Sequence, residues 1–415
     1  MKISKLLHII DVLIFVTLLL LVVDGMLPQA QLFIFKELLF PNYVLRLPLI
    51  LLLLLKIFLN YKLGLKFDGM LAFGIILYCS FVSFYVLYGF MFLESSFVEI
   101  IFALNSYYFW SGAILLILAS RLSINGELGI RYLNIFAILL CILGVFQSIT
   151  GNEIVFQRSP DDAFYVSAIW FFGRLRAFSL FTSGYAFGQF LIMLILLNIN
   201  RSMKGGWTYS SIGITALYCI TIYFTYTRAI YLSLALSIIL FFVAKNFDVL
   251  RSRIVVPLMC FLAGLIVVYA AGSKDEILNT RSSVLSSATS DERLSNWSIN
   301  FNNWYNEIPT LLFGDGTTQN VRLDIIGKVT IDNSYIAILV NSGILGLMLS
   351  LILYFFLMQS IFKKAYRFTN VGPIIFFSLW MFYSMFNNAH TNYYAFVAIV
   401  FALISYREKN KNEQK

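Results

Sequence analysis

The sequence has few charged residues, few cysteines and almost no histidine. Only 12% of its 415 residues are charged, whereas 60% are hydrophobic and 17% are aromatic. A soluble core cannot bury so much apolar surface, which excludes a soluble globular protein. The composition therefore predicts an all-α integral membrane protein.

The scarcity of cysteine and histidine argues against a metal centre. The cysteines lie in apolar runs, without a CxxC partner or a nearby histidine, at Cys79, Cys141, Cys219 and Cys260. No pair of aspartates has the surroundings of a DxD metal site. We therefore expect small core cysteines, no divalent cation and no cofactor.

Basic residues outnumber acidic ones by 30 to 21, which gives a net charge of +9. Binding to nucleic acid requires a solvated basic face, but the positive residues here are spread through short loops between apolar runs. The charge is therefore interpreted as a signal of membrane topology, and no nucleic-acid partner is expected.

The apolar runs predict about twelve transmembrane helices. The expected spans are 9–23, 43–59, 70–92, 98–120, 132–150, 178–199, 207–226, 230–244, 254–271, 333–362, 371–386 and 393–406. The first run resembles a signal peptide, but it lacks a small-residue cleavage site, so it is expected to remain as a span. Residues 31–40 are too short to span and are expected to lie in the interface.

Positive charge gives the orientation of these spans. With a cytoplasmic N-terminus, 19 Lys and Arg residues fall on the inner side and 11 on the outer side. The positive-inside rule favours this arrangement, with both termini cytoplasmic and one large external loop between spans 9 and 10. The chain thus divides into helices 1–9 (1–271), the external loop (272–331), and helices 10–12 with a cytoplasmic tail (332–415).

The polar loop 272–331 and the start of the next span hold most candidate site residues. They include Arg281, Arg293, Trp297, Asp332, Asn333 and Tyr335. Arg293 and Trp297 are four apart, on one face of a helix, where packing within the loop is the alternative to a functional role. Asp332 is suited either to capping the following helix or to catalysis.

Three arginines on the outer side run against the charge bias. Arg174 and Arg176 precede the span at 178–199, and Arg228 lies where two apolar runs meet with almost no loop. Ionisable groups near the membrane surface are costly and are usually held by a partner or a substrate. The alternatives are lipid-headgroup anchoring for Arg174 and Arg176, and snorkelling at a helix end for Arg228.

Short motifs along the chain resemble those of bacterial O-antigen polymerases of the Wzy type and O-antigen ligases. They are Thr225-Tyr226-Thr227-Arg228, Arg293-x-x-x-Trp297, Gly314-x-Gly316, Asp332-Asn333-Ser334-Tyr335 and Asn341-Ser342-Gly343. The resemblance implies a membrane-embedded glycosyltransferase of lipopolysaccharide or capsule biosynthesis. Such an enzyme lies in the bacterial inner membrane with its site facing the periplasm.

The resemblance also implies the substrates and the roles of residues. The donor is a glycan on undecaprenyl pyrophosphate, the acceptor is another lipid-linked repeat unit, and a chain-length regulator and a flippase are the expected partners. Arg228 and Arg293 would stabilise the departing pyrophosphate, and Asp332 would assist deprotonation of the acceptor. Arg174, Arg176, Arg281, Trp297, Asn333, Tyr335 and His390 are candidates for substrate binding.

One position separates the two activities within this resemblance. Ligases carry a histidine where this chain has Asp332, which favours the polymerase. His390, in the turn between the last two spans, is either near the site or a helix cap. The alternatives are ligase-like transfer to another acceptor and, in a different class, a twelve-span flippase. A flippase is less favoured because the halves of the chain do not repeat and, apart from Asp11 and Asp24, the spans are almost without charge.

Overall fold

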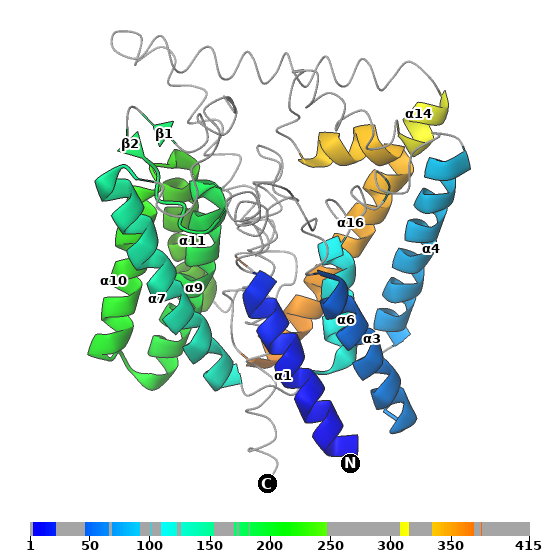
Figure 1. Cartoon of the computed structure of the whole chain (residues 1–415), viewed down its shortest axis with the longest axis horizontal. Helices are drawn as coiled ribbons and strands as arrows, with labels where there is room; N and C mark the ends of the chain where they lie inside the picture. The colour runs from blue at the N-terminus through cyan, green and yellow to red at the C-terminus, as the bar shows by residue number, and fades with distance from the viewer. Residues whose placement is uncertain are drawn as a thin grey trace, which may run out of the picture.

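The computed structural model of the chain describes residues 3–21, 46–65, 69–91, 100, 109–122, 126–152, 170–171, 174–181, 183–246, 308–314, 334–368 and 375. These residues are almost entirely helical (Figure 1). The helices are α1 (Ile3–Leu21), α3 (Arg46–Lys62), α4 (Gly69–Met91), α6 (Phe109–Ser120), α7 (Gly126–Thr150), α9 (Gly184–Gly205), α10 (Tyr209–Phe224), α11 (Arg228–Asn246), α14 (Ile308–Phe313) and α16 (Ser334–Phe368). One two-stranded hairpin pairs β1 (Trp170–Phe171) with β2 (Arg174–Leu175).

The outer faces of the helices are apolar, as a lipid environment requires. On α7, exposed hydrophobic side chains recur every three or four residues at Tyr132, Ile135, Leu139, Ile142 and Phe146. Four helices of the described part are long and apolar enough to cross a membrane: Leu71–Met91, Gly129–Thr150, Gly184–Met203 and Ile338–Phe356. The chain is an all-α membrane protein, as predicted.

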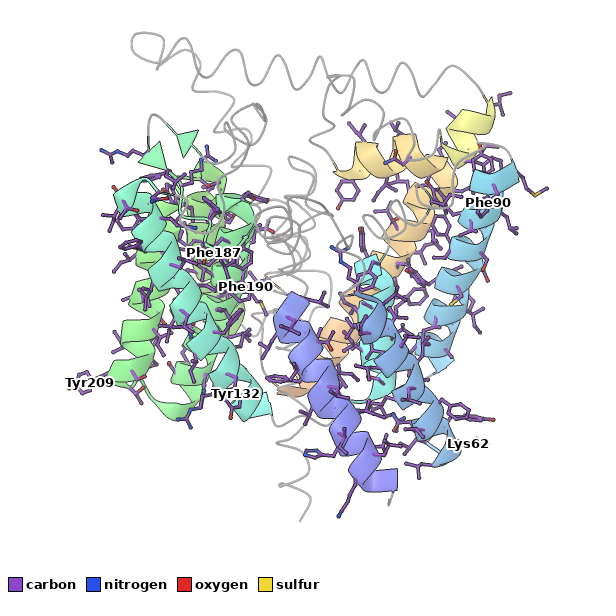
Figure 2. The ribbon with its side chains drawn as sticks, in the orientation of Figure 1. Lys62, Phe90, Tyr132, Phe187, Phe190 and Tyr209 are labelled. Carbon is purple, nitrogen blue, oxygen red and sulfur yellow. The ribbon has the colours of Figure 1, made fainter. Side chains whose placement is uncertain are left out.

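The number of spans and their orientation stay predictions. The expected spans 254–271, 371–386 and 393–406 and the interfacial segment 31–40 lie outside the described residues, apart from Ile375. Among the described helices, Lys62 and Tyr132 lie at one end and Phe90 at the other (Figure 2), an alternation that agrees with consecutive spans. The hairpin and α14 lie at the end opposite the start of α1.

The described helices form two groups (Figure 1). In one, α10 packs on α7 and α9, and α11 packs on α9. In the other, α3 packs on α1 and α6, while α4 packs on α6 and α16, and α14 lies on α16. The edge-to-face contact of Phe15 with Tyr132, at 6.4 Å between ring centroids, joins α1 to α7.

Helix α9 is the buried centre of the first group. Its residues 184–200 are all buried, and Phe187 and Phe190 stack around Phe181 with ring centroids 4.9 and 5.4 Å apart (Figure 2). A Cβ atom on Gly188 would lie 2.5 Å from the Ile230 side chain. The Gly184-x-x-x-Gly188 spacing is the small-residue pattern that lets membrane helices approach closely, and here it brings α9 against α11.

A polar network fixes the same group near its other end. The Asn134 and Asn198 amides bond to each other at 3.2 and 3.4 Å, and the Tyr218 hydroxyl donates to Asn134 Oδ1 at 2.8 Å. These three buried residues come from α7, α9 and α10. Because such groups have no water in the helix interior, satisfying them together specifies the register of the three helices.

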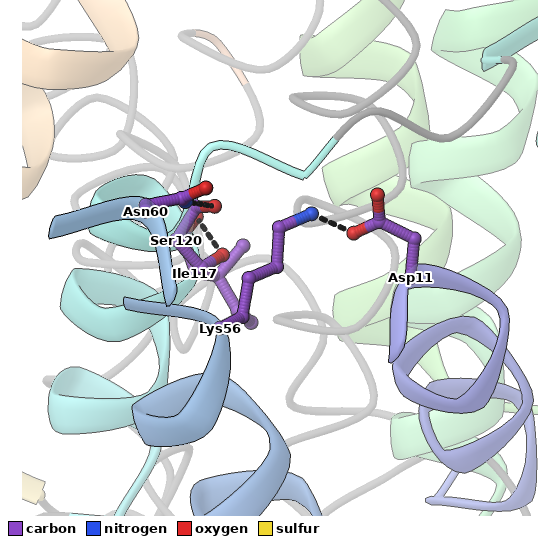
Figure 3. Close-up of polar contacts among 5 residues, drawn as sticks. All are labelled: Asp11, Lys56, Asn60, Ile117 and Ser120. Atoms are coloured by element: carbon purple, nitrogen blue, oxygen red, sulfur yellow. Dashed lines mark hydrogen bonds and ion pairs between the residues drawn. The ribbon is translucent and has the colours of Figure 1, made fainter. Parts of the chain in front are cut away.

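Lys56 corrects the topology analysis. The count of positive charges places it on the cytoplasmic side, but it is buried inside α3, 2% exposed, and forms an ion pair with Asp11 of α1 (Figure 3). Removing it leaves 18 inner positive residues against 11 outer ones, so the bias survives. Beside the pair, Asn60 donates to the Ser120 carbonyl at 2.7 Å and ties α3 to α6.

Two of the expected spans also differ from the structure, one in its first residue and one in its continuity. The span expected from residue 178 begins at Gly184, because the Ser183 hydroxyl accepts from Ala186 N–H and caps the helix there. The span expected over 333–362 is interrupted at Gly343, whose φ of 65° and ψ of −170° are not helical. Hydropathy cannot show either feature, because both are set by backbone conformation within apolar sequence.

The Asp11–Lys56 pair makes a stability prediction. The single variant Lys56→Met leaves Asp11 buried without its cation, and breaking a buried pair in this way costs about 3–5 kcal/mol. The double variant Asp11→Leu/Lys56→Met removes both charges and is expected to unfold at or above the wild-type temperature. Thermal unfolding of the purified protein in detergent measures both. Equal destabilisation of the single and double variants would contradict the assignment.

Candidate functional site

The turn between α10 and α11 is as short as the sequence predicts. Only Thr225, Tyr226 and Thr227 separate Phe224 from Arg228. The Thr225 hydroxyl donates to Ile222 O at 2.7 Å, and the Thr227 hydroxyl donates to Thr225 O at 2.9 Å. These bonds close the turn, so the Arg228 backbone begins α11 at a fixed place. The Arg228 side chain lies outside what the structure describes.

The segment after β2 lies against this turn. Ala177 N–H donates to Phe224 O at 2.8 Å, and the Ser148 hydroxyl donates to Leu175 O at 2.7 Å. A Cβ atom on Gly184 would lie 3.2 Å from both Ala177 O and Thr225 O. The ends of α7, α9 and α10 therefore hold β2 and the two residues after it in place beside the residues that precede Arg228.

Arg176 lies half-buried at this junction. Burial lowers the pKa of its guanidinium, and the nearby Tyr231 phenol acts in the opposite direction. Tyr231 comes from the first turn of α11, donates its hydroxyl to Tyr223 O, and stacks on the Tyr223 ring at 6.5 Å between centroids. A partly desolvated guanidinium interacts more strongly with an anion than one in free water does.

Tyr226 has an unusual backbone. Its φ of 47° places a bulky side chain in the left-handed region, which costs about 1–3 kcal/mol and persists where the surroundings impose it. Its ring meets Tyr223 and Phe224 at centroid distances of 6.1 and 6.3 Å. The sequence does not single out Tyr223, Tyr226 or Tyr231 as site residues, because aromatic residues at a span boundary are common anchors.

A second junction brings two other predicted motifs together. Gly314, with a φ of 81°, directly follows α14, and a Cβ atom on it would lie 2.3 Å from the Asn341 backbone. A Cβ atom on Gly343 would lie 2.2 Å from the Leu312 backbone. The two glycines thus let α14 and the break in α16 meet backbone to backbone, so any side chain at either position would separate them.

Two tyrosines of α4 complete this junction. Tyr88 donates its hydroxyl to Gly314 O at 3.4 Å, and Tyr85 donates to Asn341 O at 3.5 Å. The Tyr88 ring also lies 5.1 Å from that of Phe313. Helix α14 with Gly314, inside the long loop, and the first turns of α16 are therefore held together. Asp332 stands two positions before the first residue of α16 in the sequence.

The structure brings together some of the candidate residues and leaves others outside its description. Arg174 and Arg176 lie beside the turn that precedes Arg228, whereas Tyr335 lies in the first turn of α16, in the other helix group. The candidates outside the described residues are Arg281, Arg293, Trp297, Asp332, Asn333 and His390. Within the described ranges no three His, Cys, Asp or Glu side chains form a metal-binding group, and a metal-free reaction stays a prediction.

Comparison with known proteins gives the family. No curated protein matches the chain significantly. Residues 213–351 match the family model described as O-antigen ligase. The matched region contains most of α10, the turn before Arg228, α11, α14 and the start of α16 with its break, whereas Arg174 and Arg176 precede it. This match supports membership of the O-antigen ligase/polymerase superfamily.

Proposed function

We propose that this protein polymerises lipid-linked oligosaccharide repeat units at the outer face of the bacterial inner membrane. Membership of the superfamily supports glycan transfer of the O-antigen ligase or polymerase type. In the proposed reaction, the growing glycan leaves undecaprenyl pyrophosphate and is joined to the non-reducing end of another lipid-linked repeat unit. Polymerisation is favoured over ligation by Asp332, which stands where the ligases carry a histidine.

One observation supports the proposal: Ala177, the residue after Arg176, donates its backbone N–H to the carbonyl of Phe224, the last residue of α10 before the turn that leads to Arg228. Departure of a lipid pyrophosphate concentrates negative charge on its oxygens. Guanidiniums that are already fixed in place stabilise that charge without reorganisation, and their planar forks bind phosphate through two hydrogen bonds. In our proposal Arg228 and Arg293 contact the pyrophosphate, and Arg176 adds positive charge beside them.

The acceptor hydroxyl attacks the anomeric carbon as the bond to the pyrophosphate breaks. A positioned carboxylate assists by taking the hydroxyl proton. Asp332 is proposed for this role because the helix that follows it is anchored to α14 and α4 through Gly314, Gly343 and the two α4 tyrosines. Such anchoring fixes the first turns of α16, which directly follow Asp332 and Asn333 in the sequence, and general-base catalysis requires fixed positioning.

The two alternative functions, ligase and flippase, differ from a polymerase in whether a glycosidic bond is formed and to which acceptor. A ligase would use the same donor and the same arginines but would transfer the glycan to an acceptor other than a repeat unit. A flippase would form no glycosidic bond. The buried Asp11–Lys56 pair removes one reason against a transporter, namely spans almost free of charge, but a single pair between two neighbouring helices does not form a path across the membrane.

Arg228→Lys tests the pyrophosphate contact. Lysine keeps the charge but loses the planar two-donor fork. If one transition-state contact worth about 3 kcal/mol is lost, polymerisation falls by about a hundredfold. Arg201→Lys is the matched control, because Arg201 is an exposed arginine near the opposite end of α9, and it is expected to leave glycan length unchanged. Normal long glycan in the Arg228→Lys strain would exclude Arg228 from the site.

Asp332→Asn separates catalysis from helix capping. Asparagine caps a helix about as well as aspartate, so a residue that only caps tolerates the change. As a general base, Asp332 is required as a carboxylate, and polymerisation is expected to fall by roughly a hundredfold. Glycan length is measured by gel in strains with equal amounts of the protein in the membrane. Long chains in the Asp332→Asn strain would assign the residue to capping alone.

A further inference from the structure

A cavity of about 330 Å³ opens beside the turn that precedes Arg228. It is lined by residues 148–151 at the end of α7, by Arg174 and Leu175 of β2, and by Phe224 and Tyr226. Its volume lies at the lower end of the range for small-molecule sites, about 300–1,000 Å³. Most of its wall, residues 148–151 and 174–175, precedes the region matched by the family model.

The cavity offers both hydrogen-bond donors and acceptors. The Arg174 side chain is exposed and makes no hydrogen bond or ion pair with any residue that the structure describes. Its guanidinium carries five N–H donors in a fixed fork. The Ser148 hydroxyl donates its hydrogen to Leu175 O, so its lone pairs remain as acceptors. A sugar edge matches this combination, because each hydroxyl of a sugar both donates and accepts.

The electrostatics of the cavity favour a neutral ring over an anion. The C-terminal ends of α7, at Thr150, and of α10, at Phe224, both line it. Carbonyl groups at a helix C-terminus carry partial negative charge, which attracts cations and disfavours phosphate or carboxylate. Arg174 is therefore well placed beside two helix ends, whereas a phosphate bound there would meet two unfavourable dipoles.

Tyr226 supplies the aromatic face that a sugar ring needs. Its left-handed backbone, with a φ of 47°, would be relieved by Gly or Asn, which tolerate that region. A strained tyrosine that lines a cavity points to a use for the ring. Tyr226 precedes Arg228 by two residues, so their Cα atoms are at most about 7 Å apart. A ligand in the cavity therefore lies next to the proposed pyrophosphate site.

We infer that this cavity binds a sugar ring of the donor glycan close to its pyrophosphate, with Arg174 bonding the ring hydroxyls and Tyr226 stacking on the ring. The inference rests on the proposed function, since it assigns a sugar subsite to the same reaction. It also gives the two neighbouring arginines different roles. Arg174 contacts the sugar, and Arg176 contributes charge toward the pyrophosphate.

The test measures binding as well as activity. The probe is the strain's own repeat-unit oligosaccharide, cleaved from its lipid by mild acid, and saturation-transfer NMR detects its binding to the protein in nanodiscs. Arg174→Gln and Tyr226→Asn are each expected to weaken binding about tenfold, the effect of losing one stacking or hydrogen-bonding partner. Tyr226→Phe keeps the ring and is expected to bind nearly as wild type does.

Matched control variants and a second probe, pyrophosphate, distinguish a sugar site from a general effect of mutation and from an anion site. Arg201→Gln and Tyr209→Ala change exposed residues far from the cavity; Tyr209 is 97% exposed at the other end of α10 (Figure 2), and neither change is expected to affect binding. Inorganic pyrophosphate is expected to bind Arg174→Gln and wild type equally. In the polymerisation assay, Arg174→Gln should raise KM for the lipid-linked donor about tenfold with little change in kcat.

Three results would overturn the inference. The first is oligosaccharide binding that Arg174→Gln leaves unchanged, a decisive result because this exposed side chain is not needed for folding. The second is loss of pyrophosphate binding in that variant, which would make the cavity an anion site. The third is an effect of Arg174→Gln seen only in nanodiscs with anionic lipid, which would make Arg174 a headgroup anchor. Failure of the proposed function would appear differently, because deletion of the gene would then leave long glycan chains.

Discussion

The close approach of α9 to the turn between α10 and α11 is the constraint on which the proposed site depends. Gly184 leaves room for the carbonyls of Ala177 and Thr225, and Gly188 leaves room for Ile230. With larger side chains at these positions, the segment after β2 that carries Arg176 could not meet the turn that precedes Arg228. In lipid, where apolar surface alone does not drive helices together, small residues that increase van der Waals contact determine which helices pair. The packing of α9 against α11 and the α10–α11 turn thus determines how the residues of the proposed site are placed at the end of the helix bundle.

The second constraint acts through backbone alone. Gly314 and Gly343 place α14, which lies within the long loop, against the break in α16, and the tyrosines of α4 donate to carbonyls on both sides of that contact. A break in a membrane helix is tolerated where neighbouring groups satisfy the freed carbonyls. The two junctions lie in different helix groups and together contain most of the motifs by which the sequence resembles its superfamily.

Much of the fold follows from hydropathy, and much of the site does not. The runs that became α4, α7, α10 and α11 are long and apolar, so their existence is predictable from the sequence. Lys56 was counted among the positive charges of the cytoplasmic side; its partner Asp11 lies 45 positions earlier in the sequence, and only the packing of α1 on α3 reveals it. The start of α9 and the break at Gly343 depend on a cap and on a positive φ.

For the arginines of the candidate site, too, some features are predictable from the sequence and others are shown only by the structure. Arg174, Arg176 and Arg228 can be selected from the sequence because they oppose the charge bias, and the structure places the first two beside the turn before the third. The strain at Tyr226, the cavity next to it and the partial burial of Arg176 are products of tertiary contacts, which no local pattern encodes. The roles of Arg293, Asp332 and His390 rest on resemblance, since these residues lie outside the described part of the chain.

Deletion of the gene, followed by gel analysis of the glycan at the cell surface, tests the central claim most directly. A repeat-unit polymerase predicts that single repeat units still reach the surface and that all longer chains disappear, with restoration of the ladder by the wild-type gene. Complete loss of surface glycan would indicate a transporter, and long chains that remain on the lipid carrier would indicate a ligase. Either result would contradict the account.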